Sequence, residues 1–168
     1  TLDLVSPGDE RYEVVRRGFN KRIDKRPAVI AMCTSTAEVA EAMSVARDRD
    51  LTVAVKSGGH CMEGFSSNDD GMVINLSQMN SIRAVSGGRL VVQPGCTLGA
   101  IYDYTLERGM LLPTGSCGTV GIGGLTLGGG YGLFARKYGL TCDHLVQATM
   151  VDGYGDVHST RDDAELLW

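Results

Sequence analysis

The sequence lacks long apolar runs and targeting features. Its 168 residues hold no stretch of about 18 consecutive apolar residues, the length that a membrane-spanning helix needs. The first ten residues have neither the basic nor the apolar region of a secretion signal. We therefore expect no membrane partner and a cytoplasmic location. A signal that has already been removed stays open as an alternative, because the chain begins with Thr1.

The chain also lacks an excess of positive charge. It has 16 Lys and Arg residues against 20 Asp and Glu residues, which gives a formal net charge of -4. This balance argues against nucleic acid as a partner and favours a small molecule. Because 43% of the residues are hydrophobic, the chain can form the core of one folded domain.

The cysteines show no metal-binding spacing. The five, at positions 33, 61, 96, 117 and 142, contain no C-x-x-C pair, and His60 and Glu63 lack the helical spacing that aims two ligands at one ion. We therefore expect no metal site. Four of the cysteines are expected to be reduced and mostly buried, and Cys117 is set apart as a candidate for chemistry.

The sequence does contain an alternation of short strands and helices. Residues 28–32 and 51–55 are predicted to be strands around a helix that Ser35 and Thr36 cap, which is the length of a βαβ unit. Further predictions are strands at residues 72–75, 90–93 and 144–151, a helix at 97–108, a turn at 152–155 and the start of a helix at Asp162.

Glycine is unusually frequent, with 23 residues, about twice the usual share of roughly 7%. The first glycine loop, Ser57-Gly58-Gly59-His60, directly follows a predicted strand. Successive backbone N–H groups in such a loop can bind a phosphate without a positive surface, with Lys56 as the one nearby cation. The alternative is an ordinary Gly-Gly turn with an incidental histidine.

The second glycine loop, from Gly115 to Gly132, holds nine glycines in 18 residues. Within it, Gly130 to Ala135 fits the dinucleotide-binding pattern G-x-G-x-x-A, and Asp152 follows Gly132 by 20 residues. The preceding residues are too rich in glycine for the central strand that this pattern requires. We therefore interpret the loop as backbone packed tightly against something flat, with a flexible low-complexity loop as the alternative.

Four motifs in order resemble a known family. They are Lys56-Ser-Gly-Gly-His60-Cys-Met-Glu-Gly64, Val73-Ile-Asn-Leu-Ser77, Val92-Gln-Pro-Gly95 and the glycine loop Gly115–Gly132 with its Cys117. Together they resemble the FAD-binding domain of berberine-bridge-enzyme-like oxidases, in the wider vanillyl-alcohol oxidase and p-cresol methylhydroxylase (PCMH) group. The resemblance runs from about Ala28 to Trp168. It implies an α+β fold of the PCMH type with two small α/β subdomains. It also implies that residues 1–168 are one FAD-binding domain, truncated at its C-terminal end and without a substrate domain.

The resemblance further implies an FAD attached through two covalent bonds. His60 would bond to the 8α-methyl carbon of the flavin and Cys117 to C6. Many relatives carry a histidine where this chain has Leu125. The residues that the resemblance assigns to cofactor binding are Lys56, Ser57, Gly58, Gly59, His60, Cys61, Gly64, Gly115, Cys117, Thr119, Val120, Gly121, Gly123, Gly124, Leu125, Gly129, Gly130, Tyr131, Gly132 and Val157.

The implied activity is that of an FAD-linked oxidase. Hydride would pass from a carbon of a sugar, alcohol or alkaloid-like substrate to flavin N5, and the electrons would pass to O2. The catalytic base is expected outside this chain, so that the isolated chain would be inactive. The alternatives are a fragment of an NAD-binding Rossmann-type dehydrogenase, based on Gly130–Ala135 with Asp152, and a non-catalytic truncated flavin-binding module.

Overall fold

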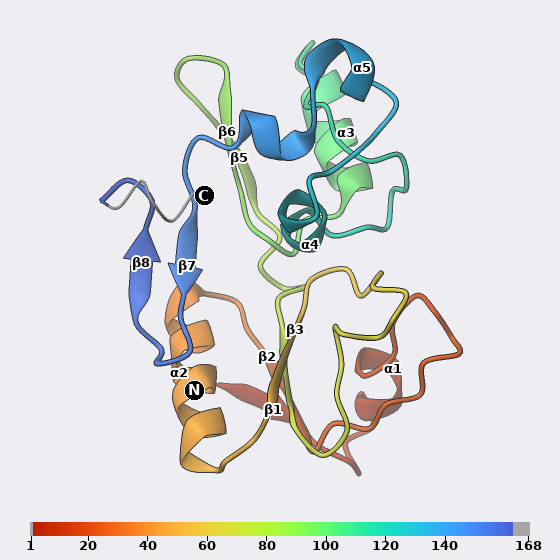
Figure 1. The fold of residues 1–168 in the computed structure, drawn as a ribbon, viewed down its shortest axis with the longest axis vertical. Coiled ribbons are helices and arrows are strands. Elements are labelled where there is room, and N and C mark those ends of the chain that lie inside the picture. Colours follow the sequence, from red (N-terminus) through yellow and green to blue (C-terminus); the bar gives the residue numbers. More distant parts are fainter. Residues whose placement is uncertain (1, 163–168) are drawn as a thin grey trace.

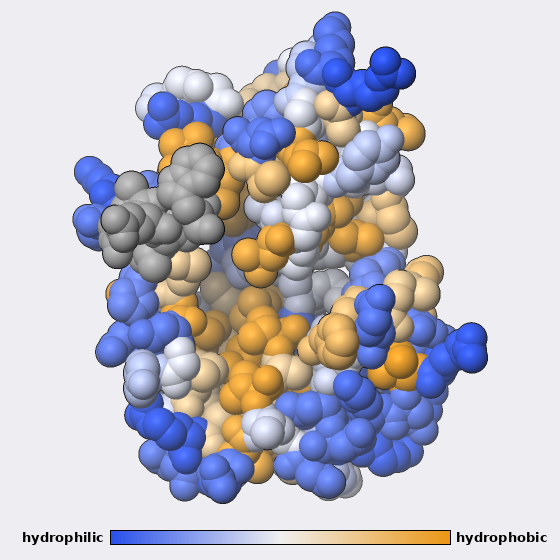
Figure 2. Space-filling view, viewed as in Figure 1, coloured by the Kyte–Doolittle hydropathy of each residue, from blue (hydrophilic) through white to orange (hydrophobic). Residues whose placement is uncertain are grey.

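The computed structural model describes residues 2–162, which form two lobes (Figure 1). The N-terminal lobe is a four-stranded sheet with one helix against each face. The C-terminal lobe contains the hairpin β5–β6 and the helices α3, α4 and α5. A second hairpin, β7–β8, lies beside α2 of the first lobe. The surface is hollowed where the two lobes meet (Figure 2).

The sheet of the first lobe has the order β1-β2-β4-β3. Its strands are β1 (Asp3–Val5), β2 (Val29–Met32), β3 (Val53–Lys56) and β4 (Met72–Asn75). Strands β2, β4 and β3 are parallel, and β1 runs antiparallel to β2. The βαβ unit expected from the sequence is present, but β4 lies between its two strands. The carboxyl ends of the three parallel strands therefore meet at one edge of the sheet.

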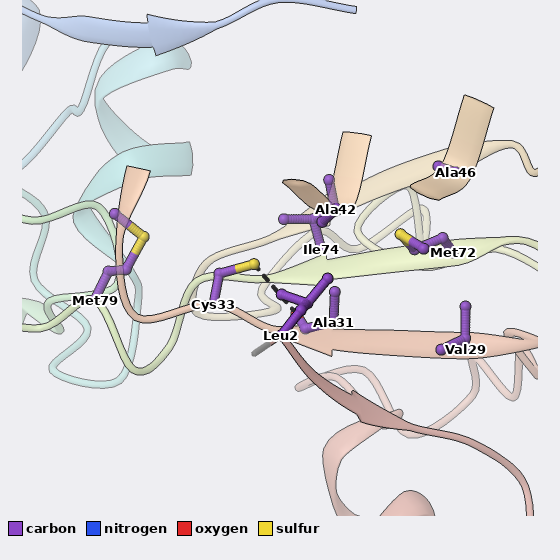
Figure 3. Packing of buried hydrophobic residues seen from close by; sticks show 9 residues of the cluster. All are labelled: Leu2, Val29, Ala31, Cys33, Ala42, Ala46, Met72, Ile74 and Met79. Atoms are coloured by element: carbon purple, nitrogen blue, oxygen red, sulfur yellow. Dashed lines mark hydrogen bonds between the residues drawn. The ribbon is translucent and has the colours of Figure 1, made fainter. Parts of the chain in front are cut away.

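The alternation of residues along β2 and β4 builds a core on each face of this sheet. Val29, Ala31, Met72 and Ile74 point to the face that α2 (Thr36–Asp48) covers, where Ala42 and Ala46 contact them (Figure 3). The residues between them, among them Ile30 and Val73, point to the other face, where Tyr12 of α1 (Tyr12–Val15) packs. Because both faces are buried, β2 and β4 are apolar in every position except Asn75.

The second lobe packs around Cys96, Leu98, Ile101 and Ile122. Its elements are the hairpin of β5 (Ile82–Val85) with β6 (Arg89–Val92), the helices α3 (Leu98–Leu106), α4 (Ile122–Leu127) and α5 (Ala135–Tyr138), and the 3-10 turn η1 (Thr141–His144). Helix α3 begins where the sequence predicted it, because the Thr97 hydroxyl accepts a hydrogen bond from Ala100 N–H.

The prediction of a strand over residues 144–151 is wrong in its first part. His144 ends η1, and only β7 (Thr149–Val151) is a strand, paired with β8 (Val157–Ser159). The turn predicted at residues 152–155 is confirmed. The helix expected from Asp162 falls on residues 163–168, outside the described part of the chain. None of the helices in residues 2–162 is long and apolar enough to cross a membrane.

Candidate functional site

The first glycine loop begins at the carboxyl end of β3, the position where open sheets of parallel strands bind ligands. Lys56, the last residue of β3, is buried, and its ammonium donates to the carbonyl oxygens of Val15 (2.7 Å) and Arg17 (2.6 Å). Burial lowers the pKa of Lys56 to about 8, and the charge of Lys21 acts in the same direction. Lys56 therefore binds the N-terminal segment that contains Val15 and Arg17 to the start of the first glycine loop.

The two glycine loops touch each other at Gly58 and Gly121. A Cβ on Gly58 would overlap the backbone nitrogen of Gly121, and a Cβ on Gly121 would overlap the Ser57 hydroxyl. The Ser57 hydroxyl in turn donates to the carbonyl oxygen of Pro94 (2.6 Å), which lies in the turn before α3. The tightly packed backbone expected for the second loop is confirmed here, and the surface against which it packs is the first loop.

The second loop is held by the start of α3. The N–H groups of Leu98 and Gly99 donate to the carbonyl oxygens of Val120 (3.0 Å) and Gly118 (2.9 Å). The loop also closes a turn on itself, since Val120 N–H donates to the Cys117 carbonyl oxygen (3.1 Å). Cys117 and Thr119 therefore lie in one short turn that is hydrogen-bonded to the N-terminal end of α3.

This packing brings the two proposed nucleophiles to one hydroxyl group. Thr119 Oγ1 lies 3.0 Å from His60 Nε2 and 3.7 Å from Cys117 Sγ. The His60 ring stacks on Phe19, with 4.3 Å between ring centroids and 17° between the planes. Phe19 N–H also donates to the Gly59 carbonyl oxygen (2.9 Å). The His60 imidazole is thus fixed both at its face and at Nε2.

Cys117 differs from the buried cysteines. It is exposed, whereas Cys33 and Cys96 are buried, and all five cysteines are free thiols. Burial raises the pKa of Cys33 to about 12 and also raises the pKa of Cys96, which makes both poor nucleophiles. Among residues 2–162, no group of three or more His, Cys, Asp or Glu residues could hold a metal ion.

A groove of about 640 Å³ lies between the first loop and the start of α3. Of the predicted cofactor-binding residues, Lys56, Ser57, Gly58 and Thr119 line it. Arg17 and Lys56 are its charged residues, and none of the described residues that line it is Asp or Glu. A protein with a net negative charge therefore carries a groove whose charged side chains are positive.

Unpaired backbone donors lie in the groove and in residues next to its lining in the sequence. Within residues 2–162, the N–H groups of Gly58, Gly59 and His60 donate to no acceptor, and neither do those of Gly118 and Thr119. Of these residues, Gly58 and Thr119 line the groove. Such groups, in two adjoining loops beside the positive end of a helix, are suited to bind a phosphate. The groove fits a cofactor that carries phosphate groups.

The other predicted residues support the loops rather than line the groove. In the first loop, Gly64 has φ +79° and packs on Ile23, and Cys61 accepts a hydrogen bond from Phe65 N–H. In α4, a Cβ on Gly123 would lie 3.0 Å from the Pro94 carbonyl oxygen. Gly124 faces open space, and a Cβ there would meet nothing within 4 Å. Val120 and Leu125 pack on the core of the second lobe.

The C-terminal part of the second loop packs against neighbouring turns. Gly115 lies against Leu125 and Leu98, Gly130 against Thr141, and Gly132 against the carbonyl of Thr114. Gly129 accepts a hydrogen bond from Cys142 N–H at its carbonyl. Two further candidates are exposed, Tyr131 at 75% and Val157 of β8 at 54%.

The dinucleotide pattern does not stand in the context that a Rossmann fold requires. The residues before Gly130 form α4 instead of a strand. Asp152 accepts the N–H groups of Tyr154 (2.8 Å) and Asp156 (2.9 Å) in its own turn. Its second oxygen pairs with His158 Nε2 (2.8 Å), which lowers the Asp152 pKa. The interpretation of these residues as an NAD site is therefore wrong.

Sequence reasoning missed the N-terminal wall of the groove. Val14, Val15, Arg17 and Gly18 line it, and Phe19 stacks on His60. A local signal was present, because six of the 16 Lys and Arg residues lie between Arg16 and Arg26. Asn75 and Ser77, at the carboxyl end of β4, also line the groove. They belong to a motif that carried the family resemblance but were not assigned to the site.

Comparison with known proteins agrees with this geometry. Residues 27–161 match the family model described as FAD binding domain. Aclacinomycin-N/aclacinomycin-A oxidase of Streptomyces galilaeus is 40% identical over 180 residues, a match that covers 99% of this chain and 33% of that protein. The crystal structure of 6-hydroxy-D-nicotine oxidase from Arthrobacter nicotinovorans is 34% identical, with a TM-score of 0.96 over 100% of this chain and 38% of that one.

A third relative bears on His60 and Cys117. It is the structure of glucooligosaccharide oxidase from Acremonium strictum, described as having a 6-S-cysteinyl, 8α-N1-histidyl FAD. It is 30% identical, with a TM-score of 0.93 over 99% of this chain and 36% of that one. The chain thus spans between 33% and 38% of the length of these proteins. On the match of residues 27–161 and the shared fold, the chain belongs to the FAD-binding domain family of berberine-bridge-enzyme-like, PCMH-type FAD-linked oxidases.

Proposed function

We propose that the protein is an FAD-dependent oxidase whose flavin is held by two covalent bonds, from a His60 ring nitrogen to the 8α-methyl carbon and from Cys117 Sγ to C6. The observation that carries the proposal is that both nucleophiles contact one hydroxyl, Thr119 Oγ1, although they belong to different loops. The histidyl and cysteinyl linkage of the glucooligosaccharide oxidase FAD supports it.

The groove supports the same cofactor. Its volume of about 640 Å³ lies in the usual range for cofactor sites, roughly 300–1,000 Å³. The free N–H groups of Gly58, Gly59 and His60 would hold the pyrophosphate, and Arg17 and Lys56 would add favourable charge. Gly124, which faces open space, would let the cofactor pass close to the backbone of α4.

The bound cofactor would supply an electrophilic ring that takes two electrons from a nucleophile or a substrate carbon and passes them to dioxygen. His60 would add through a lone pair of its neutral imidazole, releasing its N–H proton as the methyl carbon loses one hydrogen. Cys117 would release its S–H proton as C6 loses its hydrogen. In each case dioxygen accepts the two electrons and two protons and leaves as hydrogen peroxide.

For turnover, we propose a hydride transfer from a carbon of a sugar, alcohol or alkaloid-like substrate. The relatives named above, oxidases of aclacinomycin, 6-hydroxy-D-nicotine and glucooligosaccharide, motivate this range. The hydroxyls of the half-buried Tyr102 and Tyr104 are engaged elsewhere. Tyr102 donates to the Thr114 and Gly115 carbonyls, and Tyr104 accepts from Ala84 N–H. We therefore place the catalytic base outside residues 2–162.

The test is acid precipitation of the full-length protein and of its nucleophile variants. Wild type, His60→Ala and Cys117→Ala should each keep flavin in the acid pellet, because one bond remains in each single variant. Only the double variant should release all of it. Cys142→Ala, which removes a half-buried thiol away from the groove, is the control and should behave as wild type. Complete release from either single variant would show that two bonds do not form.

A further inference from the structure

We propose that Thr119 is the positioning residue for both attachment points, with its hydroxyl accepting the Nε2–H of His60 and donating its own proton to the Cys117 sulfur. The inference rests on the proposed function and deepens it, because it names the group that prepares the two nucleophiles before the flavin arrives. It concerns how the chain orients His60 and Cys117 before either bond forms, and it assigns Thr119 no bond to the flavin.

The proton count couples the directions of the two hydrogen bonds, so that the tautomer of His60 decides both. A threonine hydroxyl has one proton to donate and two lone pairs that accept. Thr119 Oγ1 is 3.0 Å from His60 Nε2, a normal hydrogen-bond length, and 3.7 Å from Cys117 Sγ, within reach of a bond to sulfur. If Nε2–H is donated to Oγ1, the lone pair of the neutral imidazole is on Nδ1 and free to attack. The hydroxyl proton then remains for the sulfur.

The surrounding backbone makes this arrangement rigid. Gly58 and Gly121 are pressed together, His60 is two residues after Gly58, and Thr119 is two residues before Gly121. The contact between Gly58 and Gly121 therefore fixes the relative position of the two loops close to the hydrogen bond between His60 and Thr119. Phe19 fixes the plane of the imidazole by stacking, so that only rotation in that plane is left for the Thr119 hydroxyl to restrict.

The backbone around Cys117 is also held by hydrogen bonds. Cys117 and Thr119 lie in the same turn, closed by Val120 N–H, and α3 binds the carbonyls of Gly118 and Val120. The sulfur and the hydroxyl therefore keep their separation without help from a ligand. One hydroxyl couples the two attachment points, and its removal should slow both bonds together.

Two substitutions separate the hydroxyl from the shape of the side chain. Thr119→Val keeps the branched shape and removes the hydroxyl, whereas Thr119→Ser keeps the hydroxyl and removes the methyl group. A packing role would be preserved in Thr119→Val and weakened in Thr119→Ser, and the proposed role predicts the reverse. Thr126→Val is the matched control, because that hydroxyl donates only to the Ile122 carbonyl oxygen (2.8 Å).

The first readout is the rate at which apo full-length protein forms acid-stable flavin after FAD is added, measured on the His60 and Cys117 peptides separately. Thr119→Val should slow both bonds about tenfold, the factor expected for one hydrogen bond of ordinary strength. Thr119→Ser and Thr126→Val should stay close to the wild-type rate. Wild-type rates in Thr119→Val, or equal losses in the Val and Ser variants, would overturn the inference.

The second readout needs no flavin. In apo-protein with ¹⁵N-labelled histidine, His60 should show an Nε2–H signal that is protected from exchange in wild type and Thr119→Ser and absent in Thr119→Val. The His60→Gln variant assigns the signal. A protected Nδ1–H instead would overturn the inference. Release of all flavin by acid from wild type would contradict the covalent attachment itself, so the two failures are distinguishable.

Discussion

Replacing Gly121 by alanine tests the contact that joins the two glycine loops. Gly121 has φ -81°, which alanine adopts easily, so any effect must come from the added methyl group. That Cβ would overlap the Ser57 hydroxyl and the Gly58 nitrogen and would lie 3.0 Å from the Gly58 Cα. Carbon atoms in contact normally lie about 3.5–4.0 Å apart, and backbone atoms cannot rotate away. The loops must therefore separate by about 1 Å.

The cost of this separation can be worked out from its parts. Forcing a methyl group into a packed site costs about 1–3 kcal/mol. Loss of the 2.6 Å hydrogen bond from Ser57 to Pro94 adds about 1 kcal/mol. Because 1 kcal/mol shifts the melting temperature of a domain of this size by about 2–4 °C, the summed cost of about 2–4 kcal/mol predicts a decrease of about 4–16 °C in the apo-protein. The 3.0 Å contact between His60 and Thr119 would lengthen beyond hydrogen-bond distance.

The assay is thermal unfolding of the apo full-length protein, followed by measurement of acid-stable flavin after FAD is added. Gly153→Ala is the matched control, since a Cβ there meets nothing within 4 Å and the residue does not need a positive φ. It should melt within about 1 °C of wild type, because it removes no contact. If Gly121→Ala also melts there and attaches flavin at the wild-type rate, the two loops do not meet as described.

Two other substitutions follow from the same geometry. Gly124→Ala adds a Cβ that meets nothing within 4 Å inside helix α4. It should leave the apo-protein as stable as wild type, or up to about 1 kcal/mol more stable, while it weakens FAD binding. Unchanged affinity in a titration of apo-protein with FAD would refute a close passage of the cofactor along α4. Asp152→Ala should lower the stability of the β7–β8 turn but leave FAD binding unchanged, and a large loss of FAD affinity would show that the turn belongs to the site.

Much of the fold could be predicted where its signals are local. The apolar strands β2 and β4, the Ser35 cap of α2 and the Thr97 cap of α3 all lie within a few residues of the structure that they specify. The short elements β1, α1 and β5 were not predicted. They depend on packing against distant parts of the chain, as when Tyr12 fills the face of the sheet opposite α2.

For the site, the sequence identified the two loops but not how they meet. His60 and Cys117 were found through their place in glycine motifs, whereas the hydroxyl that joins them depends on the contact between Gly58 and Gly121. Phe19 could not be predicted, because its stacking on His60 requires the N-terminal segment that Lys56 fastens beneath the first loop. Helix α4 was missed because glycine has a poor helix propensity, which tertiary packing overrides here.

The most direct test of the central claim is peptide mapping of the full-length protein by mass spectrometry after denaturation and proteolysis. The account predicts that one flavin joins two peptides, one with His60 and one with Cys117, and that each single variant leaves the flavin on the remaining peptide. Recovery of both peptides without added mass from protein that had bound FAD would contradict the account.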